Sequence, residues 1–328
     1  MNIVRVTFRV SLFGGGTDFK HFYKHKNATV ISFSIDRFCY ISIRELLPFF
    51  KMNYRLSWAK IEEVEKIDQF THPSVRACLS YLKIHDPLEI HTVGDLPARS
   101  GLGSSSSFTA AFLTALSLYK DKTFNKSNIV KQTIYVEQEV LKEKVGIQDQ
   151  IQVCHGGFNI TSIFKDSSYS ILSLNNSSSI IREIGESLVL VYSGITRTSS
   201  DIHKTNLSEE LRVSNEISLK KINIIAEKFA EKLKSHSADF EFFTMLLKES
   251  WEAKCDAFES SENKNILMDI YNKGIHAGAK CGKLLGAGGG GFFAFFVPPK
   301  EKNRFIKKMS PLICVMPSIN FNGIEKVL

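Results

Sequence analysis

Residues 95–107 read DLPARSGLGSSSS and lie between a strand-like run at Leu88–Val93 and a run with apolar residues at helical spacing from Phe108 to Leu116. The glycines let the backbone approach a ligand closely, and the first free N–H groups of the following helix form a site for phosphate oxygens. Four successive serine hydroxyls add donors and a candidate magnesium ligand. A flexible serine-rich linker is the alternative, but linkers are not normally followed at once by an amphipathic helix. We therefore predict an anion-binding loop, though not a Walker P-loop, since GxxxxGK[ST] requires a lysine that is absent here.

Two further glycine clusters stand at Gly14–Gly16, in RVSLFGGGTDF, and at Gly286–Gly291, in KLLGAGGGGFFAFFV. The second matches GxGxxG but precedes a strand, whereas a dinucleotide fingerprint follows a strand and opens a helix. Context therefore excludes a nicotinamide site. Taken alone, each cluster is more often a tight turn than a ligand site. The presence of three such loops in one chain favours a shared role in binding phosphate.

Glu137 places a carboxylate in an apolar helical stripe, because it aligns with Val130 and Leu141 on one face. A buried carboxylate needs a cation or hydrogen-bond donors, and a metal ion would serve. The alternative is an exposed stripe edge with Lys131 or Lys144 as a surface partner. Periodicity does not decide between the two.

Asp149 follows twelve residues later, in VGIQDQIQVCHGG, between a helix stop and a glycine pair. An aspartate at this place either acts as a general base or caps the short helix that follows. The local pattern alone favours the cap.

The order of elements along the chain is strands first and helices later, which predicts an α+β architecture. The expected strands are Ile3–Leu12, Thr29–Ile35, Phe38–Ile43, Leu88–Val93, Leu188–Tyr192 and Phe292–Val297. One helix is expected directly after the serine-rich loop, and a second over Asn128–Lys144 with Ser127 as its N-cap. Further helices are expected over most of Ser208–Lys280. Asp166–Ser179 is rich in serine and asparagine and is expected to form turns or loops.

Composition narrows the class of protein. The chain has 328 residues, 43% of them hydrophobic, and 42 basic against 34 acidic residues give a formal charge of +8, which excludes collagen-like and disordered chains. Lysines are mixed with glutamates, as in Ser218–Lys234, so a solvated surface is favoured over a nucleic-acid patch. Apolar and polar residues alternate at the N-terminus, which predicts a strand, and no membrane span is expected. The six cysteines are scattered along the chain, which indicates free thiols in a cytoplasmic protein.

In combination, the motifs resemble those of the GHMP kinase superfamily. They occur in the family's order: RVSLFGGGTDF at Arg9–Phe19, the phosphate loop at Pro97–Ser107, and GAGGGGFF at Gly286–Phe293. GIQDQ at Gly146–Gln150 is similar to the segment that carries the catalytic aspartate of the sugar kinases.

This resemblance implies a two-lobed α+β fold and a set of site residues. Residues 1–185 would form an N-terminal domain of the ribosomal S5 domain 2-like type, and residues 186–328 a ferredoxin-like C-terminal domain, with ATP between them. Asp149 would be the general base and Arg9 the cation beside it, while Ser105 and Glu137 would hold Mg²⁺. The ATP phosphates would lie on Pro97, Gly101, Leu102, Gly103, Ser104, Ser105, Ser106 and Ser107. The substrate would meet Gly15, Gly16, Thr17, Asp18, Asp149, Gly157 and Arg197.

The first motif narrows the substrate. Galactokinases carry GEHTD, whereas Gly14–Asp18 read GGGTD, so the glutamate and histidine that contact galactose are missing. With GIQDQ and SGITR at Ser193–Arg197, the chain is most similar to bacterial kinases that phosphorylate the anomeric hydroxyl of D-glycero-D-manno-heptose 7-phosphate. The resemblance thus implies a small-molecule sugar-phosphate substrate, with Arg197 either pairing with its distal phosphate or standing solvated in a loop. Fucokinase-type kinases, a non-catalytic sugar and ATP regulator, and a basic nucleic-acid binder are the alternatives.

Overall fold

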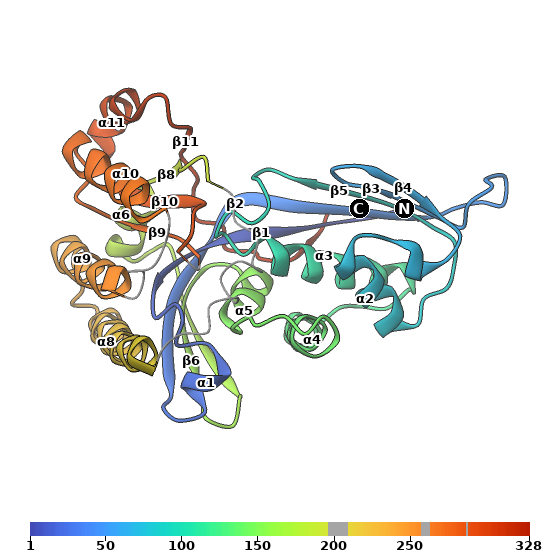
Figure 1. Cartoon of the computed structure of the whole chain (residues 1–328), viewed down its shortest axis with the longest axis horizontal. Helices are drawn as coiled ribbons and strands as arrows, with labels where there is room; N and C mark the ends of the chain where they lie inside the picture. The colour runs from blue at the N-terminus through green and yellow to red at the C-terminus, as the bar shows by residue number, and fades with distance from the viewer. Residues whose placement is uncertain (196–208, 257–262, 287) are drawn as a thin grey trace.

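The computed structural model describes residues 1–195, 209–256, 263–286 and 288–328, with side chains for all but 209–215 of these. Two β-sheets and two groups of helices make up the molecule (Figure 1). The strands of the first sheet are β1 (Asn2–Phe13), β2 (Ala28–Glu45), β3 (Tyr54–Ser57), β4 (Ile61–Val64), β5 (Leu88–Gly94), β6 (Phe158–Ile163), β7 (Tyr169–Leu174) and β12 (Glu325–Lys326). The second sheet has β8 (Leu188–Tyr192), β9 (Cys281–Leu284), β10 (Phe292–Phe296) and β11 (Cys314–Val315).

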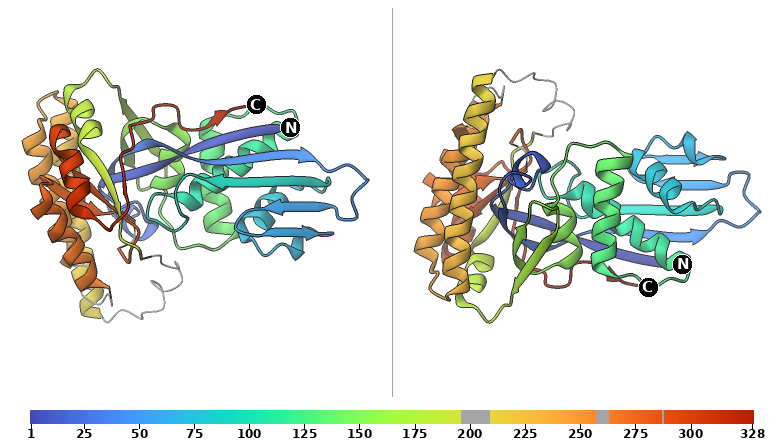
Figure 2. Two further views of the ribbon diagram at one scale, coloured as in Figure 1. Left: turned by 90° about the horizontal axis from the view of Figure 1, so that it is seen from above. Right: turned by 90° about the horizontal axis from the view of Figure 1, so that it is seen from below.

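The helices divide in the same way. The helical segments associated with the first sheet are α1 (Lys20–Tyr23), η1 (Ile67–Gln69), α2 (Pro73–Leu82), α3 (Ser104–Tyr119), α4 (Lys126–Tyr135), the π-helical turn η2 (Val136–Val140) and α5 (Gln148–His155). Those that follow are α6 (Ser179–Ser187), α8 (Glu209–Lys234), α9 (Phe240–Asp256), α10 (Lys264–Ala277), η3 (Pro299–Glu301) and α11 (Lys302–Met309). Helices α2 to α5 cover one face of the first sheet (Figures 1 and 2). Helices α9 to α11 lie against the second sheet, and α8 packs beside α9 and against β2.

The first sheet is built around β2, which runs for 18 residues without a break. Its strand order is β12-β1-β2-β5-β3-β4, and β6 also pairs with β2 and carries β7 at its side. The sequence predicted two strands at Thr29–Ile35 and Phe38–Ile43, but the pairing with β1 continues through a register shift between Thr7 and Phe8. A β-bulge of this kind bends the strand and increases its twist without ending it.

Two local predictions differ from the structure. Residues 169–174 form β7 within the segment expected to be loop, because its backbone pairs with β6 in register from Tyr169 to Leu174. The helix expected over Asn128–Lys144 begins earlier and is capped by Asn125, whose side chain accepts from the Asn128 N–H, and it widens into the π-turn η2.

The second sheet has the order β11-β8-β10-β9, all antiparallel. With helices after β8 and between β10 and β11, this is the βαββαβ topology of a ferredoxin-like domain. The sequence prediction of an α+β fold with that C-terminal topology is therefore confirmed. The strands change sheet between β7 and β8, while β12 returns to the first sheet, so the division at residue 185 remains a prediction.

Strand β10, FFAFF, explains how the two halves are joined. All five of its residues are buried. Phe292, Ala294 and Phe296 belong to the large core shared with the first sheet. Phe293 and Phe295 face the other way, into a smaller core with α9 to α11. A strand covered on both faces reads as a continuous apolar run. Among the described residues, no helix is long and apolar enough to span a bilayer.

Candidate active site

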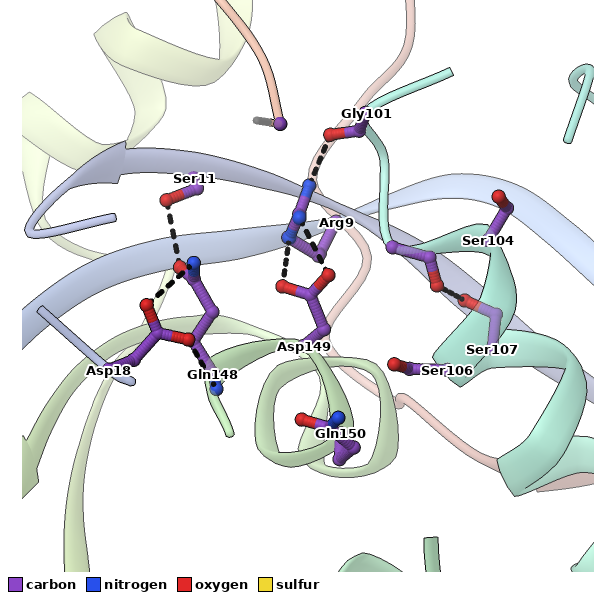
Figure 3. A network of polar contacts seen from close by, with 12 residues as sticks. Arg9, Ser11, Asp18, Gly101, Ser104, Ser106, Ser107, Gln148, Asp149 and Gln150 are labelled. Atoms are coloured by element: carbon purple, nitrogen blue, oxygen red, sulfur yellow. Dashed lines mark hydrogen bonds and ion pairs between the residues drawn. The ribbon is translucent and has the colours of Figure 1, made fainter. Parts of the chain in front are cut away.

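Arg9 and Asp149 form the centre of the candidate site. Arg9 lies on β1 and is 4% exposed, and its Nε and Nη2 donate to the two carboxylate oxygens of Asp149 at 2.8 and 2.7 Å (Figure 3). Its Nη1 donates to the Gly101 carbonyl in the phosphate loop. A bidentate arginine–carboxylate pair fixes the orientation of both groups. Asp149 stands in the first turn of α5 while Ile147 is its N-cap, so the capping role favoured by the local pattern is wrong.

Asp18 lies beside this pair and is 1% exposed. Its carboxylate accepts from the Gly16 N–H at 3.0 Å, the Gln148 N–H at 3.2 Å and the Gln148 side-chain amide at 3.3 Å. Ser11 donates to the same glutamine at 2.9 Å (Figure 3). Burial, and then the nearby charge of Asp149, raise the pKa of Asp18 to about 6. Ser11 and Gln148 were not singled out from the sequence, although Gln148 is the neighbour of Asp149 in GIQDQ.

The phosphate loop ends in α3 as predicted. Gly101 and Gly103 have φ of 81° and 73°, and Gly103 is the N-cap of the helix. Arg9 ties β1 to this loop through its own N–H, which donates to the Leu102 carbonyl at 3.0 Å. Pro97, at the start of the loop, is exposed. The free N–H groups of the first turn of α3 therefore lie next to the Arg9–Asp149 pair.

The four serines of the loop have four different environments. Ser104 accepts from the Arg99 N–H at 3.1 Å, and Ser105 is exposed. Ser106 is buried and donates to Glu137 at 3.0 Å. Ser107 donates to the carbonyls of Thr7 and Gly103. The serine in contact with Glu137 is thus Ser106, one residue beyond the Ser105 predicted to share the metal with it.

Glu137 is 1% exposed, so the surface stripe-edge interpretation with a lysine partner is wrong. Its Oε2 accepts from Ser106 and from the Gln150 side-chain amide, while its Oε1 is buried with no hydrogen-bond partner. Burial raises the pKa of Glu137 to about 8. A buried carboxylate oxygen without a protein partner fits a hard cation such as Mg²⁺, which binds one or two carboxylates together with phosphate oxygens.

The glycine-rich segment after β9 packs directly on the phosphate loop. A Cβ on Gly101 would meet the Leu285 carbonyl oxygen at 2.6 Å, and one on Gly291 would meet the Ser100 carbonyl at 2.3 Å. The Phe292 N–H donates to the same Ser100 carbonyl at 3.0 Å. Only glycine allows two backbones to approach this closely. These glycines thus allow the backbone of the glycine-rich segment to contact the backbone of the phosphate loop.

The other residues predicted to meet the substrate do not all lie near the Arg9–Asp149 pair. Gly15 lies beside Ser11 and Gln148, and the buried Thr17 closes its turn on the Gly14 carbonyl at 2.7 Å. Gly157 is at the other end of α5 from Asp149, buried, with its N–H and C=O both bonded inside the protein. No backbone group of Gly157 is therefore left for a ligand. Arg197 lies outside the described residues.

Comparison with known proteins finds several that are similar to this chain. The family described as GHMP kinases N terminal domain matches residues 72–157. D-glycero-alpha-D-manno-heptose 7-phosphate kinase of Campylobacter jejuni is 28% identical over 92% of this chain and 91% of its own length. The bifunctional fucokinase/GDP-fucose pyrophosphorylase of Arabidopsis thaliana is 26% identical over 67% of this chain and 21% of its own length.

A solved structure extends the likeness to the whole fold. A D-glycero-D-manno-heptose 1-phosphate kinase from Bacteroides thetaiotaomicron superposes with a TM-score of 0.77 at 19% identity, over 100% of this chain and 99% of the other. This chain therefore matches the GHMP kinase N-terminal family over residues 72–157 and shares the fold of a heptose-phosphate kinase along its whole length.

Proposed function

We propose that this protein is an ATP- and Mg²⁺-dependent kinase that phosphorylates the anomeric hydroxyl of D-glycero-D-manno-heptose 7-phosphate to give the 1,7-bisphosphate, for the synthesis of nucleotide-activated heptose. The observation that carries the proposal is the Arg9–Asp149 pair, held between the buried Asp18 and the phosphate loop. The full-length heptose 7-phosphate kinase relative supports the acceptor. The GGGTD motif also supports it, since the loss of a glutamate and a histidine removes bulk and one negative charge.

The reaction uses the site as follows. The acceptor oxygen forms a bond to the γ-phosphorus, the bond from that phosphorus to the β,γ-bridging oxygen breaks, and ADP leaves with the electron pair. Asp149 accepts the hydroxyl proton, and Arg9 holds this carboxylate in place and adds positive charge beside the transferred group. Phosphoryl transfer depends mainly on positioning and charge neutralisation, which these groups supply without a phosphoenzyme.

Substrate and cofactor are assigned to the groups around this pair. Asp18 hydrogen-bonds acceptor hydroxyls, with Gln148 fixing its carboxylate. Glu137 would hold Mg²⁺ together with a serine of the loop. The resemblance implies Ser105 for this role, whereas Ser106 is the serine that hydrogen-bonds Glu137. The bound cation would neutralise phosphate charge. Pairing of Arg197 with the distal phosphate remains a prediction.

An acceptor screen tests the proposal. The purified protein is given ATP and Mg²⁺ with heptose 7-phosphate, unphosphorylated heptose, fucose, galactose or mevalonate, and the product is located by NMR. We expect the highest kcat/KM with heptose 7-phosphate and a new phosphate on the anomeric carbon. The Arabidopsis relative makes a fucokinase-type activity the second candidate. Equal or better kcat/KM with fucose or unphosphorylated heptose rejects the proposed acceptor, and ATP binding without turnover of any acceptor indicates a regulator.

A further inference from the structure

Two lysines of the C-terminal half lie close to the active site, and the sequence motifs did not single out either. Lys254, in the last turn of α9, donates to the carbonyls of Leu284 and Gly286 at 2.9 and 2.6 Å. Lys283, on β9, is 5% exposed and donates to the Leu12 carbonyl of β1 at 2.6 Å. Lys254 therefore ties a helix to the start of the glycine-rich segment, and Lys283 ties the second sheet to the strand that carries Arg9.

These contacts continue into the catalytic centre. Gly286, whose carbonyl accepts from Lys254, lies against Gly101, since a Cβ on Gly286 would meet the Gly101 Cα at 2.6 Å. The Gly101 carbonyl in turn accepts from Arg9, which holds Asp149. An unbroken series of contacts thus joins Lys254 to the proposed base through two glycines that touch.

The surroundings of both lysines disfavour their charged forms. The pKa of Lys254 is lowered to about 8, first by burial and then by the charge of Arg9. The pKa of Lys283 is lowered by burial and by the charges of Lys254 and Arg9. Mutual repulsion of this kind costs free energy in the protein alone. An anion that binds beside them relieves the repulsion, which favours binding.

We propose that Lys254 and Lys283 are positioning residues that hold the glycine-rich segment and β1 in register around the phosphate loop, where the nucleotide phosphates are expected. This inference rests on the proposed use of ATP but not on the identity of the acceptor. It gives residues of the C-terminal half an indirect part in nucleotide affinity. Lys254 acts through the Gly286–Gly101 contact, and Lys283 through β1.

Binding of MgADP by titration calorimetry tests the proposal without any acceptor. We expect Lys254→Met to weaken MgADP binding about tenfold or more, Lys283→Met at least about threefold, and Lys254→Arg less than about threefold, since one decade corresponds to ~1.4 kcal/mol. In steady-state assays the KM for ATP should rise more than kcat falls. Lys273→Met is the matched control, because Lys273 also donates to two carbonyls, of Met309 and Ser310, on the outer helical layer. That variant should bind MgADP as the wild type does.

A measurement on the unaltered protein covers the case in which a variant does not fold. Amines are labelled with trace acetic anhydride, and the modification of each lysine is read by mass spectrometry with and without MgADP. We expect MgADP to slow labelling of Lys254 several-fold and to leave Lys273 unchanged. Equal labelling rates of Lys254, or a folded Lys254→Met variant with wild-type MgADP affinity, overturn the inference. Absence of MgADP binding by the wild type rejects it together with the proposed function, whereas MgADP binding with no turnover of heptose 7-phosphate rejects the acceptor alone.

Discussion

Three carboxylates of the site have different surroundings, and this divides their roles. Asp149 is paired with Arg9, Asp18 is held by amide donors, and Glu137 has one oxygen bonded and one without a partner. These surroundings are compatible with the proposed roles of Asp149 as proton acceptor, Asp18 as hydroxyl-binding group and Glu137 as metal ligand. Each assignment can be tested with a single isosteric change.

Asp149→Asn should lower kcat by roughly 100- to 10,000-fold, the usual range for a lost acid or base group, while MgADP affinity stays near the wild-type value. The change also removes the ion pair with Arg9. Glu325→Gln is the matched control, because it breaks a pair with Arg5 on the same strand, away from the site. Steady-state kinetics on both folded variants make the comparison. Near wild-type turnover of Asp149→Asn would remove this residue from the mechanism.

Glu137→Gln should change how stability depends on pH. The pKa of Glu137 rises from 4.5 to about 8 on folding, so the protonated form is favoured and stability falls as pH rises through that interval. Between pH 5.5 and 8.5, with a chelator present, we expect the wild type to lose at least about 1 kcal/mol more unfolding free energy than the glutamine variant. Urea unfolding at the two pH values measures this.

Glu139→Gln is the control for that experiment, because the Glu139 side chain is 55% exposed in the same π-turn. It should keep the wild-type pH dependence. Mg²⁺ with ADP should raise the unfolding midpoint of the wild type at pH 8 more than that of Glu137→Gln, since a ligand stabilises the state that binds it. If the unfolding free energy of all three proteins depends on pH in the same way, the Glu137 carboxyl does not have the raised pKa.

Ser106→Ala and Ser105→Ala distinguish the two serines next to the proposed metal. Ser106 donates to Glu137, so its loss should raise the Mg²⁺ concentration needed for half-maximal activity by about threefold or more, a cost of at least about 0.6 kcal/mol. The exposed Ser105 is the family-based candidate for a direct ligand, and its loss should have a similar effect on Mg²⁺ and little on stability. Activity assays over a Mg²⁺ series separate the two, with Ser117→Ala as control because Ser117 lies farther along α3 and donates to the Leu113 carbonyl. If Ser105→Ala needs the same Mg²⁺ concentration as the wild type, Ser105 is not the metal ligand and Ser106 remains the candidate.

At the scale of elements, the site depends on two loops that touch along their backbones. The phosphate loop at Ser100–Gly101 meets the glycine-rich segment at Leu285–Gly286 and at Gly291. Because the segments come from opposite halves of the chain, their contact aligns the start of α3 with β9 and α9. A side chain at this contact would separate the two halves where the nucleotide is expected to bind.

Gly101→Ala should therefore weaken ATP binding as well as stability. The added Cβ would meet the Leu285 carbonyl oxygen at 2.6 Å. An alanine would also be strained by the φ of 81° at this position. Gly194→Ala is the matched control, since Gly194 has φ 77° but open space around the added Cβ. We expect a loss of ~1–2 kcal/mol in the control from strain alone, and a larger loss with at least about tenfold higher KM for ATP in Gly101→Ala. If the two variants lose the same stability in denaturant titration and show the same KM for ATP, the contact between Gly101 and Leu285 contributes to neither.

At the scale of the whole molecule, one large core crosses the boundary between the two sheets. Leu188 and Leu190 of β8 and Phe292 of β10 belong to the same buried cluster as Val6 and Phe13 of β1. Lobes that share a core lose their packing together.

We therefore expect a single cooperative unfolding transition despite the two-lobed outline. Differential scanning calorimetry should give a calorimetric enthalpy close to the van't Hoff enthalpy. A saturating excess of MgADP, about 100 times its Kd, should move that one transition upward by the equivalent of ~2.7 kcal/mol. Two separate transitions, of which only one responds to MgADP, would indicate independent domains divided near residue 185.

The sequence by itself determined the class of fold and the places where ligands are handled. Strand alternation, helical spacing and the order of three glycine motifs depend on neighbours in the chain, so the phosphate loop, the α+β architecture and the candidates Glu137 and Asp149 could be found without coordinates. Arg9 was a candidate only through the resemblance to GHMP kinases. Strand boundaries differ from the local pattern where long-range pairing intervenes. Residues 169–174 form β7, and two expected strands form the single strand β2, because pairing with β6 and β1 decides both.

The tertiary structure alone decided which groups meet. Arg9 and Asp149 are 140 residues apart, and Leu12 and Lys283 are 271 apart, so no periodicity links them. One helical position separates Ser105 from Ser106, yet a rotation of about 100° per residue turns one outward and the other to Glu137. Local pattern favoured a cap at Asp149 and left Glu137 undecided, because burial and partner choice depend on packing between elements. Such contacts are set when β1, α3, α5 and β9 come together, since side-chain hydrogen bonds require the donor and acceptor to lie within about 3 Å.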